Sequence, residues 1–148
     1  MLAMYHDYRI QNPDKGFLCV NELEFGVPLQ TPMMSIFREK LAPTTFRSVV
    51  LEAHRFGGHD SLKAGIVDAV GGLDEVVGLI HERKLLNKAA TGIYGTMKEE
   101  MYARVLNGLD DHDGNLAWRE NVENRNEQLR GEGLKEVEKW ETSCKSKL

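Results

Sequence analysis

Two carboxylates at the end of an apolar segment are the strongest candidates for chemistry in this chain. Glu22 and Glu24 follow the apolar run Phe17–Val20 and alternate with Leu23 and Phe25. Partial desolvation by apolar neighbours makes a carboxylate a stronger base, which suits a group that takes up a proton and returns it. Residues two apart share one face of an extended segment. Local sequence therefore leaves both glutamates open as the base, beside the plainer interpretation of solvent-facing loop acids.

Other residue types that often do chemistry lack the spacing they need. The acidic stretch 110–115 fails as a calcium loop, because its glycine at the sixth position would put Leu109 where a carboxylate belongs. The five histidines are scattered, and His54 and His59 are five residues apart, so they form no metal-binding set. Cys19 is expected to be a buried, inert thiol. We expect no metal site and no glycine-rich phosphate loop.

The elements that must position Glu22 follow from turn chemistry and hydrophobic spacing. Strands are predicted over 8–10 and 17–20, on either side of the turn Asn12–Gly16, and a third over 66–70. The segment 21–28 mixes polar and apolar residues and ends in Gly and Pro, so it is predicted to be a loop or an edge segment. Helices are predicted over 31–41, 44–53, 62–64, 74–84, 97–106 and 118–140.

The ends of the predicted helices rest on capping residues. Thr44 and Thr45 are expected to cap the second helix after Pro43 interrupts the first. Gly57–Gly58 is expected to end the second helix, and Asp60–Ser61 to cap the third. The polar stretch 107–115 is predicted to be a loop between the last two helices.

Composition limits the classes of protein that the chain can belong to. It has 148 residues, 19 basic and 23 acidic, and a formal net charge of −4, which suits a globular protein without a general basic surface for nucleic acid. No apolar run approaches the roughly 18 residues of a membrane span. Two cysteines make no disulfide framework, which favours a reducing compartment. We predict an α/β segment over 1–85 and a helical tail over 86–148.

The last three residues match a targeting signal. Ser146, Lys147 and Leu148 end the chain, and a carboxyl-terminal Ser-Lys-Leu is read by the peroxisomal import receptor. The alternative is an ordinary charged tail. We therefore expect a peroxisomal location and the import receptor as a partner.

Three segments, in this order and at this spacing, resemble the enoyl-CoA hydratase/isomerase (crotonase) superfamily. They are Asp7–Ile10, Asn21–Pro28 and Leu62–Val70, and the resemblance covers roughly residues 1–80. It implies an α/β fold, a partial crotonase-like (ClpP/crotonase) ββα spiral, with a helical carboxyl-terminal tail. It also implies a fatty acyl-CoA substrate and assembly as a trimer or hexamer of identical chains.

The resemblance decides between the two glutamates. Glu22 falls at the position of the family's catalytic glutamate, four residues before Gly26. Hydratases of the family carry a second glutamate, which matches position 1, and Met1 stands there. Δ3,Δ2-Enoyl-CoA isomerases are more similar, with one glutamate in an Asn-Glu pair like Asn21–Glu22. The resemblance therefore implies an isomerase that moves a double bond from position 3 to position 2 of a fatty acyl-CoA in β-oxidation.

The same resemblance implies which residues bind the substrate. Asn21 and Phe25 are expected to contact it, and Lys88 or Lys98 to meet the phosphates of coenzyme A. A solvated lysine is the simpler interpretation. A single base suffices for a double-bond shift, so neither a metal nor a redox cofactor is expected. Coenzyme A enters only as part of the substrate.

The resemblance also implies that part of the site is missing. The backbone donors that hold the thioester oxygen in the family lie on segments upstream of Met1. The chain is therefore expected to be the carboxyl-terminal part of a longer enzyme, a truncated gene model or the product of an alternative start. Two alternatives stay open. One is a hydratase or another crotonase reaction; the other is a non-catalytic fragment that only assembles with full-length subunits.

Overall fold

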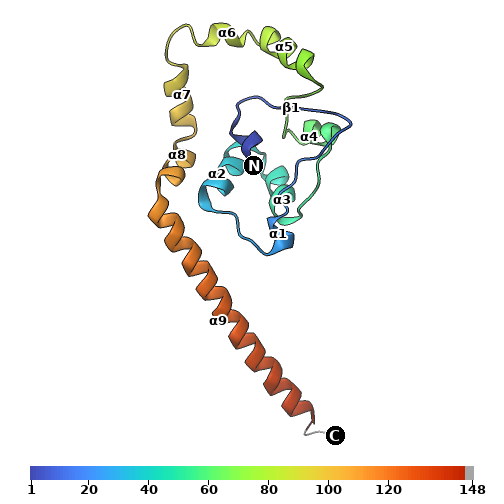
Figure 1. Cartoon of the computed structure of the whole chain (residues 1–148), viewed down its shortest axis with the longest axis vertical. Coiled ribbons are helices and arrows are strands. Elements are labelled where there is room, and N and C mark those ends of the chain that lie inside the picture. Colours follow the sequence, from blue (N-terminus) through green and yellow to red (C-terminus); the bar gives the residue numbers. More distant parts are fainter. Residues whose placement is uncertain (146–148) are drawn as a thin grey trace. The chain divides into compact units, whose positions relative to one another are not determined.

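The computed structural model describes residues 1–145, and the chain divides into two compact units, Met1–Asp110 and Asp111–Leu148. The first unit contains η1 (Leu2–Tyr5), β1 (Ile10–Gln11), α1 (Glu22–Phe25), α2 (Thr31–Lys40), α3 (Pro43–Leu51), α4 (Gly58–Lys63), β2 (Ala69–Val70), α5 (Leu73–Glu82), α6 (Leu85–Lys88), α7 (Tyr94–Met101) and α8 (Ala103–Asp110). The described part of the second unit is dominated by the long helix α9 (His112–Lys145). Figure 1 shows the order of these elements along the chain.

In the first unit, a short parallel sheet joins the amino-terminal segment to a segment about 60 residues further along the chain. β1 pairs with β2, with Ile10 opposite Ala69. Beside this pairing, the Asp68 N–H donates to the Arg9 carbonyl (2.8 Å), and the Arg9 N–H donates to Asp68 Oδ2 (3.0 Å). Arg83 donates from Nη1 to Asp68 Oδ1 at 3.0 Å. The segments 7–10 and 62–70, far apart in sequence, therefore lie side by side.

Helices surround an apolar core in this unit. The most buried core side chains are Ile36 of α2, Ile66 and Val105 of α8, each 2% exposed. α2 packs mainly against α8. The core is completed by Met4, Val20, Leu29, Phe37, Leu41, Val49, Phe56 and Val67. The predicted helices over 31–41 and 74–84 are confirmed as α2 and α5.

The segment predicted as a loop at 21–28 instead contains a helical turn. α1 begins at Glu22 after the N-cap Asn21, and Glu22 and Glu24 occupy its first turn, where acids are favoured by the helix dipole. Gly26 ends it at φ +70°, in the left-handed region that glycine adopts without strain. The strand predicted over 17–20 is reduced to one antiparallel bridge between Leu18 and Phe56.

The predicted caps around α3 and α4 are wrong. Pro43 begins α3, because proline fits the first helical turn, where an N–H has no partner. Thr45 Oγ1 donates across to the Ala64 carbonyl (2.9 Å) and caps nothing. α3 ends at Leu51, and Gly57 is the N-cap of α4, so Gly57–Gly58 begins a helix instead of ending one.

The predictions for the last part of the chain are partly right. The helix predicted over 97–106 is present as α7 and α8, which are separate on either side of Tyr102. The loop predicted over 107–115 is almost absent, since α8 reaches Asp110 and α9 begins at His112. The helical tail over 118–140 is confirmed within α9. No helix within residues 1–145 is both long and apolar enough to cross a membrane.

Candidate functional site

Glu22 differs from Glu24 in its surroundings. Glu22 is the first residue of α1 and is partly buried, whereas Glu24 is exposed. The Oε2 atom of Glu22 is buried and has no hydrogen-bond partner among the described residues. A buried polar atom without a partner costs free energy, so it calls for an explanation, and a catalytic role is one of those that account for it. The structure thus separates two glutamates that local sequence leaves equivalent.

Exposed apolar side chains follow Glu22 closely in the sequence. Leu23 and Phe25 of α1 are 55% and 72% exposed, and Val27, just beyond it, is 57% exposed. Asn21 is partly buried and lies immediately before Glu22. The local sequence Asn21–Val27 therefore offers a polar group and an acid beside an apolar surface, an arrangement suited to a molecule with a polar head and an apolar chain.

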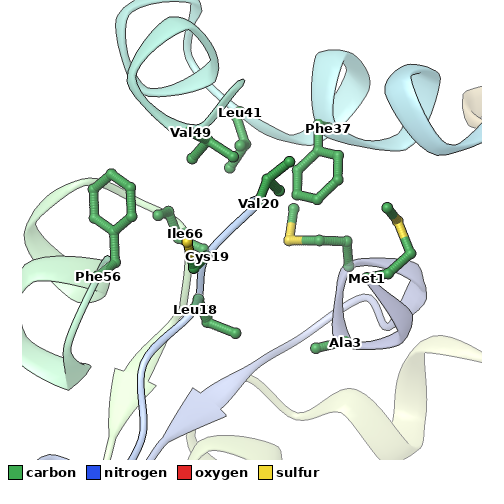
Figure 2. Close-up of a pocket in the computed structure, with 11 residues that line it drawn as sticks. Met1, Ala3, Leu18, Cys19, Val20, Phe37, Leu41, Val49, Phe56 and Ile66 are labelled. Carbon is green, nitrogen blue, oxygen red and sulfur yellow. The ribbon is translucent and has the colours of Figure 1, made fainter. Parts of the chain in front are cut away.

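A small apolar cavity is lined in part by Leu18–Val20, the segment that precedes Glu22 in the sequence. It measures about 30 Å³, and Figure 2 shows the run Leu18–Val20 crossing it between Phe56 and Phe37. Glu22 does not line it. The side chains around it carry no charge: Met1, Ala3, Met4, Leu18, Cys19, Val20, Phe37, Leu41, Val49, Phe56 and Ile66.

Met1 and Cys19, which the sequence singled out, both line this cavity. Met1, which by resemblance stands at the place of a hydratase's second glutamate, is part of its wall. Cys19 is partly buried, and its thiol donates to the Ala53 carbonyl at 3.3 Å. Both residues contribute apolar surface here.

Lys98 lies in a different hollow of the first unit. Its Nζ is 2.7 Å from Asp7 Oδ2, and this hydrogen bond raises the pKa of Lys98. The Asp7 Oδ1 atom is buried and has no partner among the described residues. The hollow is open, about 500 Å³ in volume, and is lined by Asp7, Tyr8, Tyr94, Met97, Lys98, Glu100, Met101 and Tyr102. The structure therefore gives Lys98 an acidic partner that sequence reasoning did not find.

A second lysine stands beside the same hollow. Lys40 Nζ is 4.8 Å from the centre of the Tyr102 ring and donates to the His6 carbonyl at 2.6 Å. Burial lowers the pKa of Lys40, and the positive charge of Arg9 lowers it further. The sequence carries no signal for this pairing, because Lys40 and Tyr102 lie on segments that meet only in the folded chain.

The predicted site residues thus fall into separate groups. Asn21, Glu22 and Phe25 are together in or beside α1, while Lys98 lies in the hollow around Asp7. Ser146, Lys147 and Leu148 lie outside the described residues. Within residues 1–145, no group of three or more His, Cys, Asp or Glu side chains is placed to hold a metal ion.

Comparison with curated proteins finds plant isomerases. Enoyl-CoA delta isomerase 1, peroxisomal, from Arabidopsis thaliana is 32% identical over 111 residues, which are 72% of this chain and 46% of the relative. Enoyl-CoA delta isomerase 2, peroxisomal, from the same plant is 25% identical over 112 residues, 71% of this chain and 46% of the relative. The chain spans about half the length of the curated relatives it matches. No protein-family model matches the chain.

Solved structures agree in fold. A probable enoyl-CoA hydratase from Mycobacterium tuberculosis matches with a TM-score of 0.65 at 23% identity, over 83% of this chain and 52% of that one. An enoyl-CoA hydratase from Mycobacterium marinum matches with a TM-score of 0.64 at 20% identity, over 78% and 52%. These matches confirm the predicted α/β, partial crotonase-like fold with a helical carboxyl-terminal tail. Sequence and fold together show that the chain is a partial member of the enoyl-CoA hydratase/isomerase (crotonase) superfamily.

Proposed function

We propose that this chain is part of an enoyl-CoA isomerase that moves a double bond from position 3 to position 2 of a fatty acyl-CoA. The observation that carries the proposal is the environment of Glu22, a partly buried carboxylate with an unpartnered oxygen at the start of α1. It stands at the position of the catalytic glutamate in the family that the chain resembles. The similarity to plant enoyl-CoA delta isomerases supports the same reaction.

The chemistry requires one base. Glu22 takes a proton from C2 of the acyl chain, the double bond shifts, and the same carboxyl group returns a proton to C4. The electron pair left at C2 is delocalised onto the thioester oxygen, which must be held by hydrogen-bond donors. By resemblance these donors belong to segments outside this chain. No water is activated, and no metal or redox cofactor takes part in the proposed reaction.

The surroundings of Glu22 suit an acyl-CoA. The exposed side chains of Leu23, Phe25 and Val27 provide apolar surface for the acyl chain beside the reacting carboxylate. Asn21 is next to the base and is proposed to contact the substrate. Lys98 is proposed to meet a coenzyme A phosphate, for which it would have to exchange its ion pair with Asp7.

The resemblance favours isomerisation over hydration. Hydration needs a second acid to hold and activate water, and by resemblance that acid would stand at position 1, where this chain has Met1. The runner-up function is nevertheless a hydratase, because solved structures named enoyl-CoA hydratase share the fold.

The test is a coupled assay on 3-hexenoyl-CoA with the chain extended to the length of its relatives. Glu22→Gln should lower turnover by roughly 10²–10⁴-fold, the usual contribution of a general base. Glu24→Gln is the matched control and should leave turnover within a few fold. Unchanged turnover in Glu22→Gln would remove Glu22 from the mechanism, and hydration of a 2-enoyl-CoA faster than isomerisation would favour the hydratase.

The short chain alone provides a further comparison. We propose that the 148-residue chain by itself lacks activity, because the oxyanion donors are expected elsewhere. Co-purification with an extended chain, without turnover on its own, would favour the alternative of a non-catalytic fragment that assembles with full-length subunits. Homo-oligomeric assembly of the extended enzyme as a trimer or hexamer is part of the same proposal.

We also propose a peroxisomal location. It rests on the carboxyl-terminal Ser146-Lys147-Leu148 and on the names of the plant relatives, two of which are described as peroxisomal. A fluorescent protein fused to the amino terminus should colocalise with a peroxisomal marker. Removal of Leu148 should make the signal diffuse, since the import receptor reads the free terminus.

A further inference from the structure

Two positively charged side chains of the first unit share one hydrogen-bond acceptor. The His6 carbonyl accepts hydrogen bonds from Arg9 Nη1 at 2.8 Å and from Lys40 Nζ at 2.6 Å, so the two positive groups are neighbours. Both residues are partly buried. Among residues 1–145, neither side chain forms an ion pair with a carboxylate. Buried charges in proteins are generally paired, and like charges placed together repel, so this pair calls for a negative partner.

The carboxylates of this region are already engaged. Asp7 Oδ2 accepts a hydrogen bond from Lys98 at 2.7 Å, and Asp68 Oδ1 accepts one from Arg83 at 3.0 Å. Burial lowers the pKa of Lys40, and the positive charges of its neighbours lower it further, while Asp7 and Asp68 oppose this shift. The two carboxylates therefore reduce the repulsion around Lys40 without removing it.

An aromatic surface adjoins these charges. Tyr102, whose ring centre is 4.8 Å from Lys40 Nζ, also lines the open hollow of about 500 Å³. Tyr8 and Tyr94 line the same hollow, together with two exposed methionines of α7. A molecule held by its charged group at Lys40 therefore has aromatic and thioether side chains beside it for its remaining part.

We propose that Arg9 and Lys40 bind the phosphate of a phosphate monoester whose organic part lies in the hollow, against Tyr8, Tyr94 and Tyr102. A phosphate monoester carries close to two negative charges at neutral pH, so one such group compensates both cations. The planar fork of arginine and the ammonium group of lysine are both suited to phosphate oxygens.

This inference is separate from the proposed isomerase activity. It uses neither Glu22 nor the proposed contact of Lys98 with a coenzyme A phosphate, because Lys98 is held by Asp7. Its tests measure binding and need no turnover, so either proposal can fail without the other.

The first test is calorimetric titration of the 148-residue chain with inorganic phosphate and with phenyl phosphate. Phenyl phosphate should bind severalfold more tightly, because its ring can contact the tyrosines of the hollow. Tyr94→Ala should remove this preference and leave the binding of inorganic phosphate unchanged. A dissociation constant for phenyl phosphate weaker than roughly 10 mM, or equal affinities of the wild type for the two probes, would overturn the proposal.

Variants of Lys40 separate the role of its charge from that of its packing. Lys40→Met keeps most of the alkyl stem and should weaken the binding of phenyl phosphate about tenfold or more, since hydrogen bonds to charged groups are strong. Lys63→Met is the matched control, because Lys63 is exposed on α4, and it should leave the affinity unchanged. Glu100→Gln removes a negative charge from the lining of the hollow and should tighten binding. Equal affinities of Lys40→Met and the wild type would contradict the assignment.

A third test uses the wild-type chain and so does not depend on the folding of a variant. N-Acetoxysuccinimide acetylates neutral lysine amines, and mass spectrometry of peptides gives the rate at each lysine. Phenyl phosphate should slow the acetylation of Lys40 relative to that of Lys63, because a bound dianion covers the amine and favours its charged form. An unchanged ratio of the two rates would argue against phosphate binding at Lys40 and overturn the proposal.

Discussion

At the residue scale, burial separates side chains that the sequence treats alike. Glu22 and Glu24 stand two positions apart in a similar setting, yet only Glu22 of the two has a buried, unpartnered carboxylate oxygen among the described residues. Lys98 looks like any helical lysine in the sequence, and in the fold it forms an ion pair with Asp7, which is 91 residues away. Both distinctions arise from contacts between distant segments.

The Lys98–Asp7 pair should make stability depend on pH. The hydrogen bond from Lys98 to Asp7 raises the pKa of Lys98 in the folded state. A raised lysine pKa adds stability that is fully present below the unfolded value, about 10.4, and is lost as the pH rises through the folded pKa. Because the Lys98 side chain is 41% exposed, the contribution should be no more than about 1 kcal/mol. Urea denaturation from neutral to alkaline pH should show the loss in the wild type and a shallower profile in Lys98→Gln.

At the scale of elements, the short sheet depends on one carboxylate. Asp68 accepts hydrogen bonds from the Arg9 N–H and from Arg83 Nη1, both at 3.0 Å, and so ties the first segment and the end of α5 to the strand β2. The sequence suggested that the segments 7–10 and 62–70 belong together only through family resemblance. The structure supplies the physical reason, since these segments complete each other's hydrogen bonds.

Removal of the Asp68 carboxylate should therefore destabilise the first unit. Asp68→Ala leaves the Arg9 N–H and one guanidinium without their acceptor, which should cost about 1–3 kcal/mol in the free energy of unfolding. Asp14→Ala, at an exposed turn residue, is the control and should cost much less. Chemical denaturation of both variants measures the difference, and equal stabilities would contradict the role given to Asp68.

The start of α5 provides a second prediction at this scale. Glu75 Oε2 accepts a hydrogen bond from the Gly72 N–H at 2.6 Å, and this bond lowers the pKa of Glu75. A lowered acid pKa adds stability that is present above the unfolded value, about 4.3, and is lost as the pH falls through the folded pKa. Thermal unfolding from pH 7 downwards should show a steeper acid loss for the wild type than for Glu75→Gln. Identical pH profiles would mean that this cap does not stabilise the helix.

At the scale of the whole molecule, the two units differ in what holds them together. The first unit has an apolar core around Ile36, Ile66 and Val105. The described side chains of α9 are mostly exposed, so this helix buries little apolar surface within its own unit. The predicted boundary near residue 85 remains a prediction about domains, and the compact units themselves meet at Asp110–Asp111.

The sequence by itself determined the features that depend on neighbouring residues and on repeated spacing. The helices α2, α5 and α9, the charge balance, the motifs of the crotonase superfamily and the position of Glu22 among them were all readable from it. These features can be predicted because helix periodicity and motif spacing are local properties of the chain.

Only the tertiary structure decided the features that depend on contacts across the chain. It turned the predicted loop around Glu22 into the helix α1 and reduced the strand predicted over 17–20 to a single bridge. It also buried one oxygen of Glu22 and gave Lys98 its partner Asp7. The physical reason is that desolvation and ion pairing depend on which distant segments meet, and local propensity carries no information about those contacts.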